Sequence, residues 1–334
     1  MKKNFILFTA IVLLATIGSM FGQTTHAYIW DATNGPRDLG TLGLDSFAYA
    51  VNDSGTVVGA YVPLDESNFH GFIWTETTGM VDLGIPGGGD SENAECVPTA
   101  INSAGNVVGY ARQVDGRQVA FFWTPSDGFT TLGDVSTRQC DSCNGAFAIN
   151  DLNQVTGNLL RSGTYHAFLW EPGMVRPRDL GTIDGEGFST GLAINNLGRI
   201  AGAASSSSNW APMIWSRRTG MRFLSEYGSL FAQAQAMNDA SQVVGLDETG
   251  TRDLAWYSSP ETGLTFLQGL GGNSTSAHAI NQQGVIVGYS IEVTNVAHGV
   301  MWPTPSSAPV VLPLGNCYGI NNVGQVVGWA AAAP

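Results

Sequence analysis

The feature that most constrains the fold of this chain is a ten-residue phrase that recurs along it, for the last time at residues 319–328. Each copy holds a small or apolar pair, an Asn, a polar turn, and an apolar pair followed by Gly. The copies are anchored by Asn52, Asn102, Asn150, Asn195, Asn238, Asn281 and Asn321, which lie 40 to 50 residues apart. An active site is usually assembled once, so a phrase repeated this often indicates scaffold rather than chemistry.

Two other phrases alternate with the Asn phrase. The aromatic phrase reads His-Ala-Tyr-Ile-Trp at 26–30 and recurs at 70–74, 119–123 and 166–170, with looser copies ending at Trp215, Tyr257 and Trp302. The Asp-Leu-Gly phrase starts at Asp38 and recurs from Asp82 and Asp179, with weaker copies elsewhere. The chain is therefore a repeat protein.

Each repeat predicts four short β-strands separated by turns. The Asn phrase supplies two of them, joined by a tight hairpin whose Asn side chain bonds its own backbone two residues on. The last turn position favours a left-handed backbone, which Gly adopts readily. Five copies place Gly there, namely Gly55, Gly105, Gly198, Gly284 and Gly324, and the other two have Asn153 and Ser241.

Units of this length with four strands are typical of a β-propeller, because a closed ring protects the strand edges that a linear array exposes. We therefore expect an all-β, seven-bladed β-propeller of four-stranded blades. The chain begins with an aromatic and an Asp-Leu-Gly strand (28–30 and 37–39) and ends after an Asn hairpin (318–328). This order predicts that N- and C-terminal strands join in one blade and close the ring.

The N-terminus has the pattern of a secretory signal. Lys2 and Lys3 precede an apolar run over residues 5–21, so we predict a signal peptide at 1–22 and a single propeller domain at 23–334. The alternative is an uncleaved membrane anchor, since the run is just long enough to span a bilayer. We expect a bacterial protein that is secreted, periplasmic or held at the cell surface, with no membrane span after signal removal.

Charge narrows the class of partner. The formal net charge is −13, and both lysines of the chain lie in the predicted signal. A net negative charge of this size repels nucleic acid and anionic membrane surfaces. Nucleic-acid binding is therefore not expected.

The three phrases together resemble those of the HAF-repeat family of extracellular bacterial proteins. The clearest pieces are His166-Ala167-Phe168-Leu169-Trp170, residues 38–43 and residues 320–328, and the resemblance covers residues 26–328. It implies secretion and a β-repeat fold. It brings no established activity and no catalytic residue, and the copies around 210–215 and 253–257 depart from the pattern most.

Four of the five histidines begin aromatic phrases in different repeats, so they are not expected to converge on a metal. No Gly-x-Ser-x-Gly elbow, His-Glu-x-x-His helix or phosphate loop is present in the sequence. We predict no catalytic, cofactor-binding or metal-binding residues. Carboxylate pairs for glycoside cleavage stay an open alternative, because the fold rather than sequence separation sets their spacing.

Cysteines and long connectors mark one face of the predicted ring. Four cysteines in an exported chain predict two disulfides with three possible pairings among Cys96, Cys140, Cys143 and Cys317. A redox or zinc role for the Cys140–Cys143 pair is the alternative. Irregular insertions on a regular scaffold often bind partners, so the candidate binding face includes Asp90, Glu92, Glu95, Trp210 and Trp329.

The sequence thus predicts an exported, non-enzymatic repeat protein that binds an extracellular protein or glycan and needs no cofactor. The alternatives are a lectin-like carbohydrate-binding propeller, with equivalent pockets between blades, and a polysaccharide hydrolase.

Overall fold

The computed structural model describes residues 24–64, 68–88, 94–114, 116–133, 145–185, 187–206, 209–224 and 231–332. These ranges contain 28 β-strands and no helix. Among them, no helix is long and apolar enough to cross a membrane. The predicted signal peptide lies outside the described residues.

The strands follow one another in groups of four. The first strands are β3 (Ser46–Val51), β7 (Glu95–Ile101), β11 (Gly145–Ile149), β15 (Ser189–Ile194), β19 (Phe231–Met237), β23 (Gly271–Ile280) and β27 (Asn316–Ile320). The second strands are β4 (Val57–Tyr61), β8 (Val107–Arg112), β12 (Val155–Arg161), β16 (Ile200–Ser206), β20 (Val243–Glu248), β24 (Ile286–Glu292) and β28 (Val326–Ala331). Each first and second strand together come from one Asn phrase.

The third strands carry the aromatic phrase and the fourth strands the Asp-Leu-Gly region. The third strands are β1 (Thr25–Asp31), β5 (His70–Thr75), β9 (Gln118–Thr124), β13 (Thr164–Trp170), β17 (Asn209–Ser216), β21 (Asp253–Ser259) and β25 (Ala297–Trp302). The fourth are β2 (Gly35–Asp38), β6 (Gly79–Asp82), β10 (Gly128–Thr131), β14 (Arg178–Asp179), β18 (Gly220–Phe223), β22 (Gly263–Phe266) and β26 (Val310–Val311).

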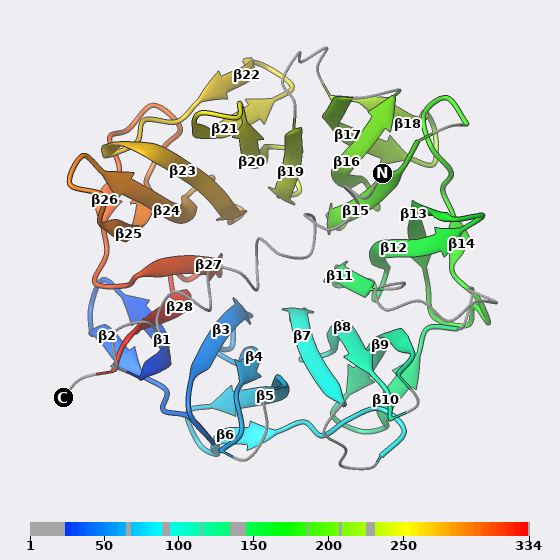
Figure 1. Cartoon of the computed structure of the whole chain (residues 1–334), viewed down its shortest axis with the longest axis horizontal. Helices are drawn as coiled ribbons and strands as arrows, with labels where there is room; N and C mark the ends of the chain where they lie inside the picture. Colours follow the sequence, from blue (N-terminus) through cyan, green and yellow to red (C-terminus); the bar gives the residue numbers. More distant parts are fainter. Residues whose placement is uncertain are drawn as a thin grey trace.

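Within each group the strands pair antiparallel in the order first, second, third, fourth. Four of the groups are separate four-stranded sheets in the described chain, and the other three are linked into a twelve-stranded sheet. The links are one-residue parallel bridges, Trp210 to Phe231 and Asp253 to Ser274. Figure 1 shows the sheets arranged around a central opening, with the first strands innermost and the fourth strands at the outer edge.

The two ends of the chain meet in one sheet. Its order is β2-β1-β28-β27, and β1 pairs with β28 from Thr25 opposite Ala331 to Trp30 opposite Val326. The N- and C-terminal strands therefore join as the sequence predicted. Backbone hydrogen bonds between strands at opposite ends of the chain hold this sheet together.

The hairpin of each Asn phrase is a three-residue loop. In the first copy, Asn52 N–H donates to Thr56 O and Gly55 N–H donates to Asn52 O. Gly55 has φ 79°, and Asn153 and Ser241 take the same left-handed conformation in their copies, with φ 58° and 61°. This is the backbone conformation that the sequence predicts for the last turn position.

A close approach of the backbone explains the Gly that ends each Asn phrase. A Cβ on Gly59 would lie 2.0 Å from Phe47 O and 2.8 Å from the ring of Phe72. Phe72 is directly opposite Gly59 in the neighbouring strand and is 0% exposed. The same approach to a first-strand backbone O recurs at the equivalent glycines, and Gly59, Gly109 and Gly245 also make room for the aromatic ring of the neighbouring strand.

Candidate functional site

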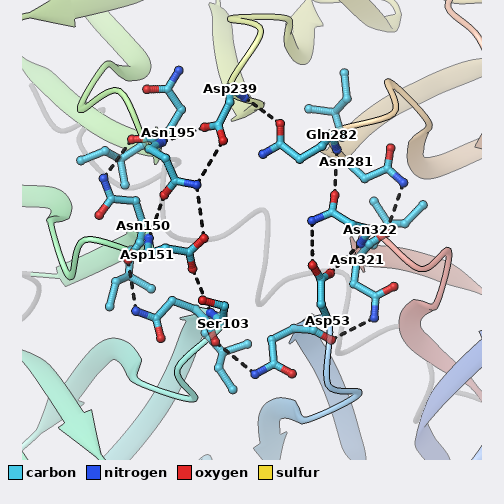
Figure 2. A pocket seen from close by; sticks show the side chains of 18 of the residues that line it. Asp53, Ser103, Asn150, Asp151, Asn195, Asp239, Asn281, Gln282, Asn321 and Asn322 are labelled. Carbon is cyan, nitrogen blue, oxygen red and sulfur yellow. Dashed lines mark hydrogen bonds between the residues drawn. The ribbon is translucent and has the colours of Figure 1, made fainter.

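The anchoring Asn residues form a closed ring of hydrogen bonds at the axis. Each side-chain Nδ2 donates to the backbone O of the next anchoring Asn. The bonds are Asn52 to Asn102 at 3.1 Å, Asn102 to Asn150 at 3.1 Å, Asn150 to Asn195 at 2.9 Å, Asn195 to Asn238 at 3.2 Å, Asn238 to Asn281 at 3.0 Å, Asn281 to Asn321 at 3.2 Å and Asn321 to Asn52 at 2.9 Å. We call this set the Asn ring; Figure 2 labels four of its members, Asn150, Asn195, Asn281 and Asn321.

The other side-chain atom of each ring Asn holds its own turn. In Asn195, Oδ1 accepts from the backbone N–H groups of Leu197 and Arg199 at 3.1 and 3.0 Å. The ring Asn residues are all buried. Each Asn therefore fixes a hairpin and ties that hairpin to the next sheet, and only the first of these two roles is readable from the sequence.

A second ring follows at the residue after each ring Asn. Its members are Asp53, Ser103, Asp151, Asn196, Asp239, Gln282 and Asn322. From Ser103 onward, each backbone N–H donates to the side-chain oxygen of the next member, ending with Asn322 to Asp53 at 2.8 Å. We call these seven residues the rim.

The rim and the Asn ring surround a cavity of about 250 Å³ on the axis. Its other lining residues are apolar, one before each ring Asn: Val51, Ile101, Ile149, Ile194, Met237, Ile280 and Ile320. We call this cavity the axial cup. Its surface is formed mainly by carboxylate, amide and hydroxyl groups, because five of the seven apolar residues, Val51, Ile149, Ile194, Met237 and Ile280, are buried.

Hydrogen bonds lower the pKa of one rim carboxylate, Asp151. Partial burial acts to raise the pKa of Asp151, but hydrogen bonds from Ser103 and the Asn196 amide outweigh burial and lower it. The Asn196 Nδ2 bridges Asp151 and Asp239, at 3.2 and 3.1 Å from their Oδ2 atoms. The rim is thus a connected polar surface with three carboxylates.

The phrase-initial histidines pair with acids of their own sheet. His26 Nδ1 lies 2.8 Å from Asp38 and His166 Nδ1 lies 2.9 Å from Asp179. These aspartates also accept from a backbone N–H two residues on, such as Gly40 to Asp38 at 2.7 Å. The recurrence of His with Asp-Leu-Gly therefore reflects a structural bond between neighbouring strands, and in the described residues no His, Cys, Asp and Glu group is suited to hold a metal.

Every first strand has a β-bulge three residues before its ring Asn. The bulged residues are Tyr49, Thr99, Phe147, Leu192, Gln235, His278 and Tyr318. Bulges commonly re-aim a side chain. This position differs in chemistry from copy to copy, in contrast to the invariant Asn.

Three of the bulged side chains form a row of contacts across adjacent sheets. Tyr318 stacks on His278 with ring centroids 5.4 Å apart, and Tyr49 meets Tyr318 edge-on at 5.6 Å. His278 Nδ1 donates to Cys317 O at 3.0 Å. Burial lowers the pKa of His278 to about 4, only partly offset by the bond to Cys317, so its imidazole is neutral.

Three residues of the predicted binding face, Glu95, Trp210 and Trp329, lie within the described ranges. Asp90 and Glu92 lie outside the described residues. Trp329 packs edge-on against Phe47 and Trp210 contacts Phe188, so both tryptophans are partly buried packing residues. Glu95 lies 3.9 Å from Arg112, and burial raises its pKa.

Glu248 is a second carboxyl whose pKa is raised by burial, with Asp253 and Asp247 adding to the shift. Glu95 starts β7 and Glu248 ends β20, and these strands lie on opposite sides of the central opening (Figure 1). The structure therefore does not bring these two acids together as a catalytic pair.

Cys96 and Cys317 are buried free thiols, which differs from the disulfides predicted for them. Each packs under a glycine of the neighbouring third strand: a Cβ on Gly71 would lie 3.2 Å from Cys96 Sγ, and one on Gly299 2.7 Å from Cys317 Sγ. Burial raises the pKa of both thiols well above the usual range. Cys140 and Cys143 lie outside the described residues.

Solved structures show the fold. The β-propeller domain of the Trilobed protease from Pyrococcus furiosus matches at 11% identity over 84% of this chain and 83% of that chain, with a TM-score of 0.57. A puromycin hydrolase mutant complexed with PGG matches at 11% identity over 85% of this chain and 49% of that chain, with a TM-score of 0.60. At these identities the likeness gives the fold alone: the chain is an all-β protein with a β-propeller fold.

TolB from Acinetobacter baumannii is 17% identical over 75% of this chain and 65% of that chain, with a TM-score of 0.49, too low to carry an argument. The chain thus spans less than two thirds of the TolB and puromycin hydrolase chains. No protein-family model and no curated protein matches the sequence. The HAF-repeat resemblance therefore stays a prediction.

Proposed function

We propose that this protein is an exported, non-enzymatic propeller of seven blades that binds an extracellular ligand in the axial cup. The observation that carries the proposal is the difference between the repeated polar residues of the scaffold and the variable polar residues of the rim. The repeated Asn, His and Asp side chains are committed to bonds within the scaffold. The rim side chains also accept hydrogen bonds from neighbouring rim residues, but they differ from copy to copy and line the axial cup. Irregular positions on a regular scaffold are where binding usually occurs.

The seven-blade count rests on the Asn ring. Seven hairpins are linked in sequence by side-chain bonds, and the last bond returns from Asn321 to Asn52 over 269 residues. A ring of this kind closes only if each hairpin belongs to an equivalent unit. Seven units of four strands account for the strands described.

A glycan is the favoured ligand class for the cup. The carboxylate, amide and hydroxyl side chains of the cup can accept and donate hydrogen bonds to the hydroxyl groups of a sugar. Equivalent sugar pockets at the aromatic phrases are less favoured, because Trp74, Trp170 and Trp302 are all buried. A lectin-like protein with this structure would therefore bind sugar at the axis rather than in pockets between blades.

The test uses protein that lacks residues 1–22, applied to a glycan array and to immobilised extracellular extract, with a parallel assay for released reducing sugar. A double variant, Asp151→Asn with Asp239→Asn, removes two rim charges, and Asp127→Asn in an exposed outer turn is the matched control. We expect binding without turnover, weakened at least roughly tenfold by the rim variant alone, as loss of charge-assisted bonds predicts.

Three results would overturn the proposal. Release of sugar would make the protein a hydrolase. Equal binding by the rim variant and the parent would place the ligand elsewhere. Equal loss in the rim and control variants would indicate a non-specific charge effect rather than a site.

A further inference from the structure

The arginines of this acidic chain are unevenly distributed. After residue 23 the sequence holds 12 arginines and no lysine, and six of the arginines fall between residues 176 and 222. One of them, Arg199, donates to Ser241 Oγ at 2.6 Å. The other five are exposed, namely Arg176, Arg178, Arg217, Arg218 and Arg222. We call them the arginine patch.

The patch spans the outer edge of two neighbouring sheets. Arg178 belongs to β14 and Arg222 to β18, which are the fourth strands of their groups. Figure 1 shows both strands at the outer edge of the molecule. Arg176 precedes β14, and Arg217 and Arg218 lie in the turn before β18. Arg217 and Arg218 occupy turn positions where other repeats have Glu76 and Glu261. Arg178 corresponds to Arg37, which also directly precedes an Asp-Leu-Gly phrase.

Contacts across the sheet boundary join the patch. The Arg178 guanidinium lies over the ring of Trp215, 5.9 Å from its centroid, and Trp215 is in the same strand as Ile214, the register partner of Arg222. Glu171 forms an ion pair with Arg217, and its pKa is lowered first by that hydrogen bond, with a smaller contribution from the charge of Arg178. Arg178 and Arg217 thus both interact with one carboxylate.

Positive charge remains in excess at this edge. Glu171 interacts with both Arg217 and Arg178. Asp179 already pairs with His166 and Arg161. Arg176, Arg218 and Arg222 form no ion pair with any residue in the described ranges. An exposed guanidinium offers a planar fork of donors that fits a carboxylate.

We propose that the arginine patch binds an acidic polysaccharide chain through its carboxylate groups. A flexible chain can follow the narrow edge and contact the arginines alone. A flat anionic membrane would also face residues outside the patch, and the chain as a whole is acidic. The net charge of −13 therefore favours a polymer strand over a membrane plane.

This site is separate from the axial cup, since it lies on fourth strands at the outer edge rather than on the hairpins at the axis. It would give an exported propeller a means of retention in a carboxylate-rich matrix while leaving the cup free. Loss of one binding activity should leave the other intact.

The test measures binding of the chain without residues 1–22 to polygalacturonate, with dextran as the neutral polymer and anionic phospholipid vesicles as the membrane arm. The patch variant is Arg218→Gln with Arg222→Gln. The matched control is Arg117→Gln with Arg252→Gln, two exposed arginines in other sheets. Thermal unfolding of both variants verifies that the fold is kept.

We expect salt-sensitive binding to polygalacturonate, none to dextran, and a loss of at least roughly tenfold in the patch variant with little change in the control. Equal loss in both variants, binding to vesicles but not to polygalacturonate, or no binding to polygalacturonate at low salt would each overturn the proposal. Polymer binding by a variant with a disabled rim would show that the two sites are independent, and its failure there would contradict the separation of the sites.

Discussion

Removal of a single ring Asn should destabilise the whole fold. Asn195 is 3% exposed and makes three hydrogen bonds: its Nδ2 to Asn238 O, and its Oδ1 from the N–H groups of Leu197 and Arg199. Asn195→Ala deletes all three. Asn238 O keeps a second hydrogen bond, from Ser241 N–H. The larger effect is that the N–H groups of Leu197 and Arg199 lose their side-chain acceptor. At about 1 kcal/mol per bond, the expected cost is roughly 2 to 3 kcal/mol.

The assay is equilibrium urea unfolding followed by tryptophan fluorescence, with the cost read from the midpoint shift at constant slope. Asn195→Asp keeps both accepted bonds but replaces the donor with an oxygen that faces Asn238 O. We expect it to be as destabilising as Ala at neutral pH and to recover part of its stability in acid, where the carboxyl can donate. Asn273→Ala, at an exposed Asn of β23, is the control and should change stability by less than about 0.5 kcal/mol.

A cost for Asn195→Ala no larger than that of the control would refute the structural role of the Asn ring. So would an aspartate variant equal to the parent at neutral pH, since it lacks the donor that links neighbouring sheets.

Three further predictions address other parts of the molecule. His278 has a pKa of about 4 in the folded protein and about 6.5 in the unfolded chain. Its contribution to the free energy of unfolding is therefore complete above pH 6.5 and falls by roughly 2 to 3 kcal/mol as the pH drops toward 4. Measurements of unfolding free energy against pH should lack this decrease in the His278→Gln variant. Ser103→Asn should provide a side-chain oxygen long enough to accept a hydrogen bond from the Asp53 N–H and so complete the series of rim bonds. The free energy of unfolding should rise by about 1 kcal/mol in the same denaturant assay. An unchanged or lower free energy of unfolding would contradict this interpretation of the rim. Cys96→Ser should be tolerated, with a thermal midpoint within a few degrees of the parent, because Ser189 at the matching position accepts the Ala167 N–H at 2.8 Å; a collapse of expression would instead indicate a tightly apolar site.

Local patterns predicted much of the fold because they concern neighbours in the chain. The Asn-x-x-Gly turn and the alternation of three phrases lead directly to hairpins and their order. The joining of β1 with β28 also followed, since the two ends of the chain carry complementary halves of one repeat. In each case the physical cause lies within a few residues or in strand order.

The candidate site was not predictable in the same way. Asn52 to Asn102 is a bond between residues 50 apart whose geometry exists only once the hairpins converge on the axis. The rim residue Asp151 looked like an ordinary solvent-exposed turn residue. The bulges at Tyr49 and His278 depend on the register of the paired strand, which no short phrase specifies.

Cys96 shows how a residue type can mislead. In a chain predicted to be exported, a cysteine suggests a disulfide, yet here the thiol takes the place that a serine hydroxyl has in two other repeats. Alignment of the repeats against one another, with Cys96 opposite Ser46 and Ser189, carries the signal that the residue type alone does not.

The sheet shared by the two ends of the chain also sets the order in which the protein can form. The β1 edge from Thr25 to Trp30 has its partner, β28, at the opposite end of the sequence. During synthesis the first hairpin must therefore wait, with one edge unpaired, until nearly the whole chain has been made. Contacts of such long sequence separation slow folding, and open strand edges favour aggregation. A nascent chain of this protein is expected to need protection of its first two strands for as long as the last two are missing.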